Sequence, residues 1–282
     1  MKQFLIGNVL LQIDYAGISV ISEGNLQKFR YDGIWEGETV QLVCSSEPLS
    51  RYTEQVLKRD NHVFGIYSYL GKQILIYHWG NLFHGFGVWP DQFAITFDPA
   101  MYTQTPIRED WFFSICAFHR QMLNRRACVL HASYVDIGGE AILFTGPSGI
   151  GKSTQADLWT RHGGAQIING DRALLRKING KWHVFGYPCC GTSGVCINRN
   201  LPLRAIVVLS QAQENRVIHF SSAEKIRTLV SATELYPWDP EEIGMAVNIS
   251  QEIASEIPVV NLRCRPDRDA VEVLKAFLED NK

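Results

Sequence analysis

A glycine-rich segment near the middle of this 282-residue chain constrains its fold more than any other feature. Residues 146–154 read GPSGIGKST, which matches the pattern G-x-x-x-x-G-K-[ST] in full. That pattern requires a strand before it and a helix after it. The apolar residues 142–144 predict the strand, and the segment that follows Lys152 predicts the helix. The residues expected to bind a nucleotide are Gly146, Pro147, Ser148, Gly149, Ile150, Gly151, Lys152, Ser153 and Thr154.

Each residue type in this motif has a physical role. Glycines let backbone N–H groups turn inward without a Cβ in the way, and together with the helix N-terminus these amides form a nest for anions. Lys152 is expected to place its ammonium on the β- and γ-phosphates, and the Ser153 hydroxyl is expected to bind Mg²⁺, while Thr154 continues the helix. The alternative is a purely structural glycine-rich turn, which the order of strand, motif and helix disfavours.

A carboxylate for the metal is expected at Asp171, nineteen positions after Lys152. Residues 166–169 predict a short strand that returns from the helix, so Asp171 should lie at the same edge of the sheet as the phosphates. We therefore expect Asp171 to bind Mg²⁺ directly or through water. The alternative is a solvated aspartate in Asn-Gly-Asp, which is itself a turn-like tripeptide.

A histidine is expected beside the phosphate-binding loop. Glycines at 138–139 predict a two-residue hairpin turn, which sets the partner of every residue in the two strands. The expected pairs are Asp136 with Ala141, Tyr134 with Leu143, and His131 with Gly146. In that position a neutral His131 could accept the proton of an attacking hydroxyl, and a protonated one could contact the transferring phosphoryl group. The alternative is a strand histidine that only satisfies its own hydrogen bonds.

The pattern of apolar residues divides the chain into two domains. Residues 1–104 show short apolar runs between Gly, Asn and Asp breakers, which predict a smaller β-rich N-terminal domain. Two prolines bracket a boundary near residue 104, and residues 107–125 then show the spacing of one amphipathic helix. Residues 105–282 predict an α/β domain. Its expected elements are a hairpin at Asn179-Gly180, a capping box of Ser221 and Glu224, helices over 240–256 and 267–280, and a strand over 259–263.

Composition narrows the classes of partner and the compartment. The 27 Lys and Arg residues nearly balance the 29 Asp and Glu residues, for a net charge of −2, so neither nucleic acid nor an acidic membrane is expected as a partner. No apolar run approaches the roughly 18 residues that span a bilayer, and Asp14 closes the N-terminal apolar segment, which predicts a strand rather than a secretory signal. Seven scattered cysteines do not predict a disulfide framework, so a cytoplasmic location is expected.

Three segments together resemble the HPr kinase family, the bacterial P-loop serine kinases that are structurally related to ATP-dependent PEP carboxykinase. They are Leu130–Asp136, Gly146–Ser153 and Asn169–Arg172. The resemblance implies a PEP-carboxykinase-related nucleotide-binding fold for the C-terminal domain. It also implies an active site formed by His131, Lys152, Ser153 and Asp171, with ATP and Mg²⁺ as cofactors.

Two departures from the family pattern bear on the chemistry. The first aspartate of the family's Asp-Asp pair, its presumed base, falls on Gly170 here, so His131 or Asp171 must be considered as the base. The family's Glu-Ile-Arg-Gly signature is absent, and residues 186–194 read GYPCCGTSG in that region. The pattern is more similar to the divergent HPr-kinase-like proteins of ribosomal-peptide modification, including lasso-peptide kinases, whose acceptor is a peptide serine.

The chain is therefore expected to be an ATP- and Mg²⁺-dependent phosphotransferase that phosphorylates a hydroxyl. The acceptor that the sequence favours is a Ser of a peptide or protein. Lys152, Asp171 and His131 are its expected catalytic residues, and Ser153 and Asp171 its expected metal ligands. The resemblance also allows a homo-oligomer. Three alternatives stay open: a carboxykinase acting on a small carboxylic acid, a kinase of a small-molecule hydroxyl such as free serine, and a catalytically silent nucleotide-binding regulatory module.

Overall fold

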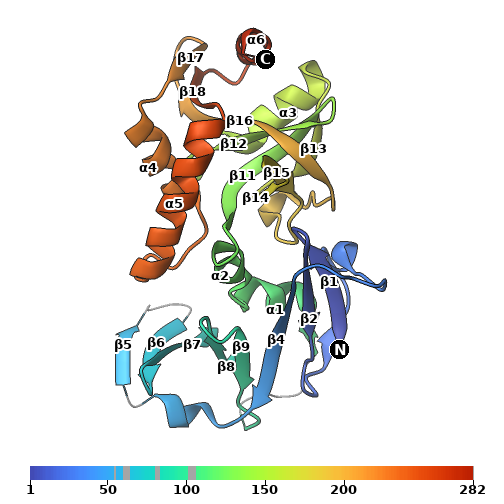
Figure 1. Ribbon diagram of the computed structural model, residues 1–282, viewed down its shortest axis with the longest axis vertical. Helices are drawn as coiled ribbons and strands as arrows, with labels where there is room; N and C mark the ends of the chain where they lie inside the picture. Colours follow the sequence, from blue (N-terminus) through green and yellow to red (C-terminus); the bar gives the residue numbers. More distant parts are fainter. Residues whose placement is uncertain (54, 60–63, 80–82, 101–105, 282) are drawn as a thin grey trace. The chain divides into compact units, whose positions relative to one another are not determined.

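The computed structural model describes residues 1–53, 55–59, 64–79, 83–100 and 106–281. The chain is a mixed α/β protein, as expected, and it divides into two compact units, Met1–Gln121 and Met122–Lys282 (Figure 1). The domain boundary expected between residues 104 and 105 lies outside the described residues.

The first unit is built mainly of strands. One eight-stranded sheet holds, in spatial order, β1 (Lys2–Ile6), β2 (Val9–Ile13), β4 (Thr39–Ser46), β9 (Ala94–Phe97), β8 (Phe83–Trp89), β7 (Lys72–Trp79), β6 (Phe64–Tyr69) and β5 (Gln55–Arg59). A separate parallel pair joins β3 (Val20–Ile21) to β10 (Ile107–Arg108). Two 3₁₀ helices, η1 (Leu26–Phe29) and η2 (Leu49–Tyr52), lie in the connections. The sequence pattern did not predict β8, whose glycines lower strand propensity, or β5.

The single helix expected over 107–125 is two helices, so that expectation was wrong. They are α1 (Glu109–Ile115) and α2 (Phe118–Leu123), and between them Ala117 takes a left-handed conformation with φ of 57°. Residues 116–118 are all buried. A continuous helix with 3.6 residues per turn cannot turn three consecutive side chains toward the same core, so tertiary packing overrides the helical period here.

The second unit is built on strands that close on themselves. Its sheet runs β12 (Glu140–Thr145), β11 (Ala127–Ile137), β14 (Arg172–Ile178), β15 (Lys181–Phe185), β16 (Asn200–Gln211), β18 (Val259–Cys264) and β17 (Arg216–His219), and β13 (Gln166–Asn169) pairs with β11. Because β12 also pairs with β16, the first five strands of this order form a ring. The long strands β11 and β16 each pair with three others, β11 with β12, β13 and β14, and β16 with β12, β15 and β18.

Helices cover both faces of these strands (Figure 1). α3 (Lys152–His162) and α6 (Arg268–Asp280) share one hydrophobic cluster with Phe144, and α4 (Ser222–Ala232) and α5 (Pro240–Glu256) share another with Leu143. Consecutive residues of a strand point to opposite faces, so Leu143 and Phe144 are buried in different clusters. A strand buried on both faces has a continuous run of apolar residues in its sequence. Residues 142–144, which precede the glycine-rich segment, show this pattern.

The expected turns and caps of this unit are confirmed. β11 and β12 are joined at Gly138-Gly139, with φ of 58° and 94°, and the register pairs Tyr134 with Leu143 and Asp136 with Ala141 as expected. Asn179-Gly180 joins β14 to β15, and the Ser221 capping box opens α4. Among the residues that the structure describes, no helix combines the length and the apolar character needed to cross a membrane.

Candidate functional site

The glycine-rich loop, residues 146–151, joins the end of β12 to the start of α3. Gly146, Gly149 and Gly151 all have positive φ, at 141°, 76° and 113°, a conformation that side chains with a Cβ rarely adopt. Lys152 opens α3, and its Nζ donates to the carbonyls of Gly146 at 3.1 Å and Pro147 at 3.2 Å. The ammonium therefore lies against its own loop, beside the positive end of the helix dipole.

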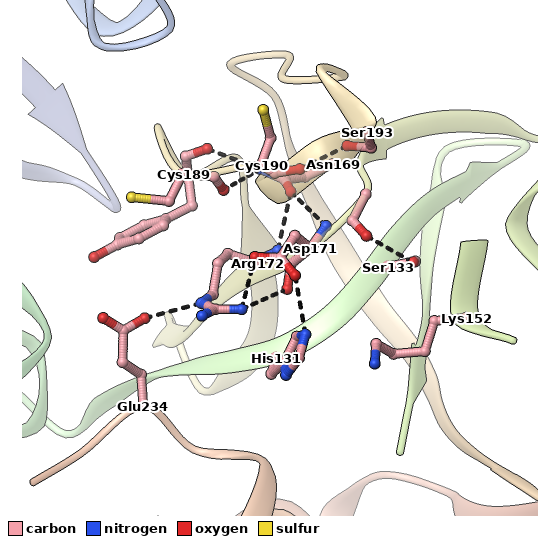
Figure 2. A network of polar contacts seen from close by, with 12 residues as sticks. His131, Ser133, Lys152, Asn169, Asp171, Arg172, Cys189, Cys190, Ser193 and Glu234 are labelled. Atoms are coloured by element: carbon pink, nitrogen blue, oxygen red, sulfur yellow. Dashed lines mark hydrogen bonds and ion pairs between the residues drawn. The ribbon is translucent and has the colours of Figure 1, made fainter. Parts of the chain in front are cut away.

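An ordered row of charged side chains lies beside this loop (Figure 2). One oxygen of Asp171 is 2.9 Å from Nε2 of His131, and the other accepts from Nη1 of Arg172 at 2.7 Å. Nε of Arg172 in turn donates to Glu234 at 3.1 Å. Both Asp171 oxygens and both sides of the guanidinium are thus engaged, which holds the carboxylate in one orientation.

Strand pairing positions His131 relative to Asp171. In the β11–β14 pairing, His131 lies opposite Arg172, and the next residue, Ala132, donates its backbone N–H to the carbonyl of Asp171 at 3.0 Å. On the other edge of β11, the Thr145 hydroxyl donates to the His131 carbonyl at 2.8 Å. The residue just before the loop therefore ties the histidine strand to the loop strand.

Asn169 orients the turn that carries the carboxylate. Its buried side-chain oxygen accepts from the backbone N–H groups of Asp171 and Arg172, both at 2.9 Å. Its amide nitrogen donates to the carbonyls of Tyr187 at 2.8 Å and Cys189 at 3.1 Å. We did not predict a role for Asn169, although Asn-Gly-Asp is a sequence that favours this kind of side-chain turn.

His131, Lys152 and Asp171 line one cavity of about 320 Å³. Eight of its lining residues were expected from the sequence: His131, Ser148, Gly149, Gly151, Lys152, Ser153, Thr154 and Asp171. Four others were not: Gly170, Cys190, Thr192 and Ser193. The other three expected residues, Gly146, Pro147 and Ile150, lie outside the lining. The carbonyls of Gly146 and Pro147 accept from Lys152, and Ile150 packs against the core cluster of α3 and α6.

The electrostatics of the cavity favour an unprotonated histidine. Burial, and then the positive charges of Arg172 and Lys152, lower the pKa of His131, while Asp171 opposes the shift. A neutral His131 that donates from Nε2 to Asp171 keeps a lone pair on Nδ1, which can accept a proton. Burial, and then Arg172, also lower the pKa of Lys152, and Asp171 again opposes the shift. A cation desolvated in this way gains more from an anionic ligand.

The donor set of the cavity suits Mg²⁺ bound together with phosphates. Within the described ranges, no group of three or more His, Cys, Asp or Glu side chains could hold a metal ion by itself. Mg²⁺ commonly uses only one or two protein ligands and completes its shell with phosphate oxygens and water. The Ser153 hydroxyl and the Asp171 carboxylate line the same cavity, and each carboxylate oxygen has a lone pair beyond the one used by His131 or Arg172.

A larger cavity of about 930 Å³ adjoins the same loop. Its lining begins at Gly149, Thr154 and Gln155 and continues over the ends of β16, β17 and β18. Arg216 and Arg263, both in this lining, lie directly opposite each other in the β17–β18 register. Facing like charges are unfavourable without a counter-charge, so this cavity suits a ligand that carries negative charge or a π-face.

Comparisons with known proteins give one match among curated sequences. No family model matches the chain. The chain is 26% identical over 151 residues to an HPr kinase/phosphorylase from an Exiguobacterium species, a match that covers 52% of this chain and 45% of the relative. The chain thus spans about half the length of that relative. Among solved structures, the HPr(Ser) kinase/phosphatase from Coxiella burnetii matches with a TM-score of 0.31 and 14% identity, over 54% of this chain and 88% of that chain.

Proposed function

We propose that this chain transfers the γ-phosphoryl group of ATP to the hydroxyl of a Ser in a peptide or protein. The premise is that the chain is a divergent relative of the HPr kinases, as its motifs predicted and its match to a curated relative bears out. One observation carries the proposal: Lys152, Ser153, Asp171 and His131, which are distant in sequence, line a single cavity at the N-terminus of α3. A phosphoryl-transfer site needs this combination of a cation, a metal-binding oxygen pair and a base.

The loop and Lys152 would bind the nucleotide. The Nζ of Lys152 would exchange its bonds to the Gly146 and Pro147 carbonyls for phosphate oxygens, beside the amides of the glycine-rich loop. Thr154 lines both cavities, so phosphates in the smaller cavity can continue into the larger one. We assign the nucleoside to the larger cavity, where Arg216 and Arg263 offer a guanidinium face to a ribose or base.

Asp171 and Ser153 would hold Mg²⁺, which supplies charge neutralisation on the phosphates when it is bound. The protein's own contribution is to orient the reacting groups. Asp171 accepts from Nε2 of His131, which leaves Nδ1 of a neutral imidazole to take the proton of the acceptor hydroxyl. Arg172, held by Glu234, keeps the carboxylate in place. Because Gly170 has no side chain, we assign the role of base to His131.

Lys152→Ala tests the proposal directly. Removing one preorganised charge contact from a phosphoryl-transfer site costs about 10²–10³ in kcat, so we expect that loss in the transfer of labelled γ-phosphate to Ser-containing peptides. Lys181→Ala removes an exposed lysine of β15 and serves as the matched control, with transfer unchanged. Wild-type turnover in the Lys152→Ala protein would contradict the assignment. Free serine, assayed in parallel, separates a peptide kinase from a kinase of a small hydroxyl.

A nucleotide-binding regulatory module is the second candidate, and Gly170 is the observation that favours it. Without a side chain at this position, the site has one carboxylate where a second could assist the acceptor. Calorimetry with Mg·ATP distinguishes the two functions. Heat of association together with transfer to at least one acceptor supports the kinase, whereas association with neither transfer nor hydrolysis supports the silent module.

A further inference from the structure

A short loop with two hydroxyl groups closes the smaller cavity. Residues 191–194, which we call the hydroxyl loop, form a 3₁₀ turn over Gly191–Ser193 and end in the left-handed conformation at Gly194. Thr192 and Ser193 of this loop line the same cavity as Lys152 and Ser153. A glycine at each end lets the chain turn sharply enough to present both hydroxyls.

The hydroxyl loop lies against the turn at Asn169–Asp171, which we call the acidic turn, through two close approaches. A Cβ added to Gly170 would lie 2.2 Å from Oγ of Ser193, and a Cβ added to Gly191 would lie 2.9 Å from Cγ of Asp171. Only glycines allow contacts this close. In the view of Figure 2, Ser193 lies above Asp171 and His131 lies below it. Ser193, Asp171 and His131 thus line the same cavity.

The Ser193 hydroxyl is both held in place and accessible. It donates to the Cys190 carbonyl at 2.6 Å and accepts from the Val195 N–H at 3.3 Å, yet the residue is exposed. An ordered nucleophile in the cavity avoids the entropy cost of bringing an acceptor to the site. The fold thus places a seryl hydroxyl of the chain itself in the lining of the cavity that holds Lys152 and Asp171.

We propose that Ser193 is a site of self-phosphorylation when no acceptor peptide is present. The inference rests on the proposed function, because it requires ATP in the cavity. In the reaction, Oγ of Ser193 forms a bond to the γ-phosphorus, the bond from that phosphorus to the bridging oxygen of ADP breaks, and the hydroxyl proton passes to water. The products are phosphoseryl 193 and ADP.

Phosphorylation would change the contacts of the hydroxyl loop. A phosphoserine carries about −1.5 to −2 charges at neutral pH and repels a neighbouring carboxylate. Next to Asp171, that charge drives the hydroxyl loop away from the acid and opens the cavity toward an acceptor. The reaction is also expected to slow when a peptide acceptor competes for the same position.

The test is incubation of the full-length protein with Mg·ATP alone, followed by intact-mass measurement and mapping of the modified residue. We expect the added mass of one phosphoryl group on Ser193, at a rate per molecule that does not depend on protein concentration. Ser193→Ala should abolish the modification. Thr192→Ala tests the neighbouring hydroxyl, and Ser231→Ala, which removes an exposed hydroxyl of α4, is the matched control. Ser231→Ala should be modified as the wild type is, and Thr192→Ala should still carry the phosphoryl group on Ser193.

Each other outcome overturns the inference. If the modification persists in Ser193→Ala but disappears in Thr192→Ala, the modified residue is Thr192 and not Ser193. A rate that rises with protein concentration rules out transfer within one molecule. A protein that binds Mg·ATP by calorimetry and phosphorylates a peptide, yet never modifies itself, overturns the self-phosphorylation while the proposed function stands. A folded protein that binds no Mg·ATP overturns both.

Discussion

Among single residues, His131 is the group whose charge state the site controls most directly. Its Nε2 lies 2.9 Å from a carboxylate oxygen of Asp171, and the positive charges of Arg172 and Lys152 also act on it. Burial and the two cations outweigh the carboxylate, so its pKa lies below the ordinary value of 6.5. The histidine is therefore neutral at pH 7, in the state that a general base requires.

The pH dependence of transfer tests this assignment. Because the pKa of His131 is lowered, the basic form persists below pH 6.5 and is lost only as the pH falls through the lowered value. We expect kcat/KM to decline on the acidic side with a midpoint below 6.5, and the decline to disappear in His131→Gln, whose residual activity is lower. A wild-type midpoint above 6.5 would show that another group is the base.

The same shift affects stability with a defined sign. The unfolded chain binds a proton at His131 near pH 6.5, whereas the folded protein binds it only at lower pH. The neutral histidine therefore contributes stability above 6.5, and this contribution is lost as the pH falls toward the lowered pKa. At this scale the sequence predicted Lys152 from the motif, His131 from the hairpin register, and Asp171 from a short strand expected to return from the helix. Glu234 was not predicted, because it is 62 positions from Arg172 in a segment without a motif.

At the scale of elements, the contact between the acidic turn and the hydroxyl loop can be tested by adding a methyl group at Gly170. In Gly170→Ala the new methyl group would lie 2.2 Å from Oγ of Ser193, and overpacking of this kind costs about 1–3 kcal/mol in the free energy of unfolding. The double variant Gly170→Ala/Ser193→Gly removes the clashing atoms and should recover most of that loss. Urea unfolding of both proteins measures the difference.

A second glycine provides the control for this prediction. Gly244, inside α5, has open space around an added Cβ, so Gly244→Ala should stabilise the protein by about 0.5–1 kcal/mol through helix propensity. If both glycine substitutions stabilised the protein, the close approach of Ser193 to Gly170 would be wrong.

The first turn of α4 is a further test at this scale. The side chain of Ser221 accepts from the backbone N–H of Glu224, and the Glu224 side chain accepts from the backbone N–H of Ser221. Ser221→Ala should lower the free energy of unfolding by about 1 kcal/mol, measured by urea denaturation. Ser231→Ala, on the exposed face of the same helix, should change it by less. Equal effects would show that the cap does not stabilise the helix.

For the whole molecule, the division into units predicts where nucleotide binding resides. Every residue that lines either cavity belongs to the second unit, Met122–Lys282. We expect a fragment with this unit alone to bind Mg·ATP with heat similar to that of the full chain, and its Lys152→Ala variant to bind less. Circular dichroism first establishes that the fragment is folded. A folded fragment that does not bind nucleotide would mean that the first unit contributes to the site.

The sequence alone determined the features that depend on neighbours along the chain. The glycine-rich loop, the hairpins at 138–139 and 179–180, and the cap at Ser221 are set by backbone conformations that a few adjacent residues permit or forbid. Strand alternation and hairpin register then placed His131 beside the loop, because each strand residue has a defined partner.

Only the tertiary structure decided which distant groups meet. Packing splits the helix after residue 115. The link from Arg172 to Glu234 and the approach of Ser193 to Gly170 join segments whose separation in sequence carries no local signal. Such contacts depend on which buried surfaces pack together and on which charges must be paired when they do. The glycine-rich loop of the site therefore follows from a local motif, whereas the ion pairs that hold the Asp171 carboxylate follow from the fold.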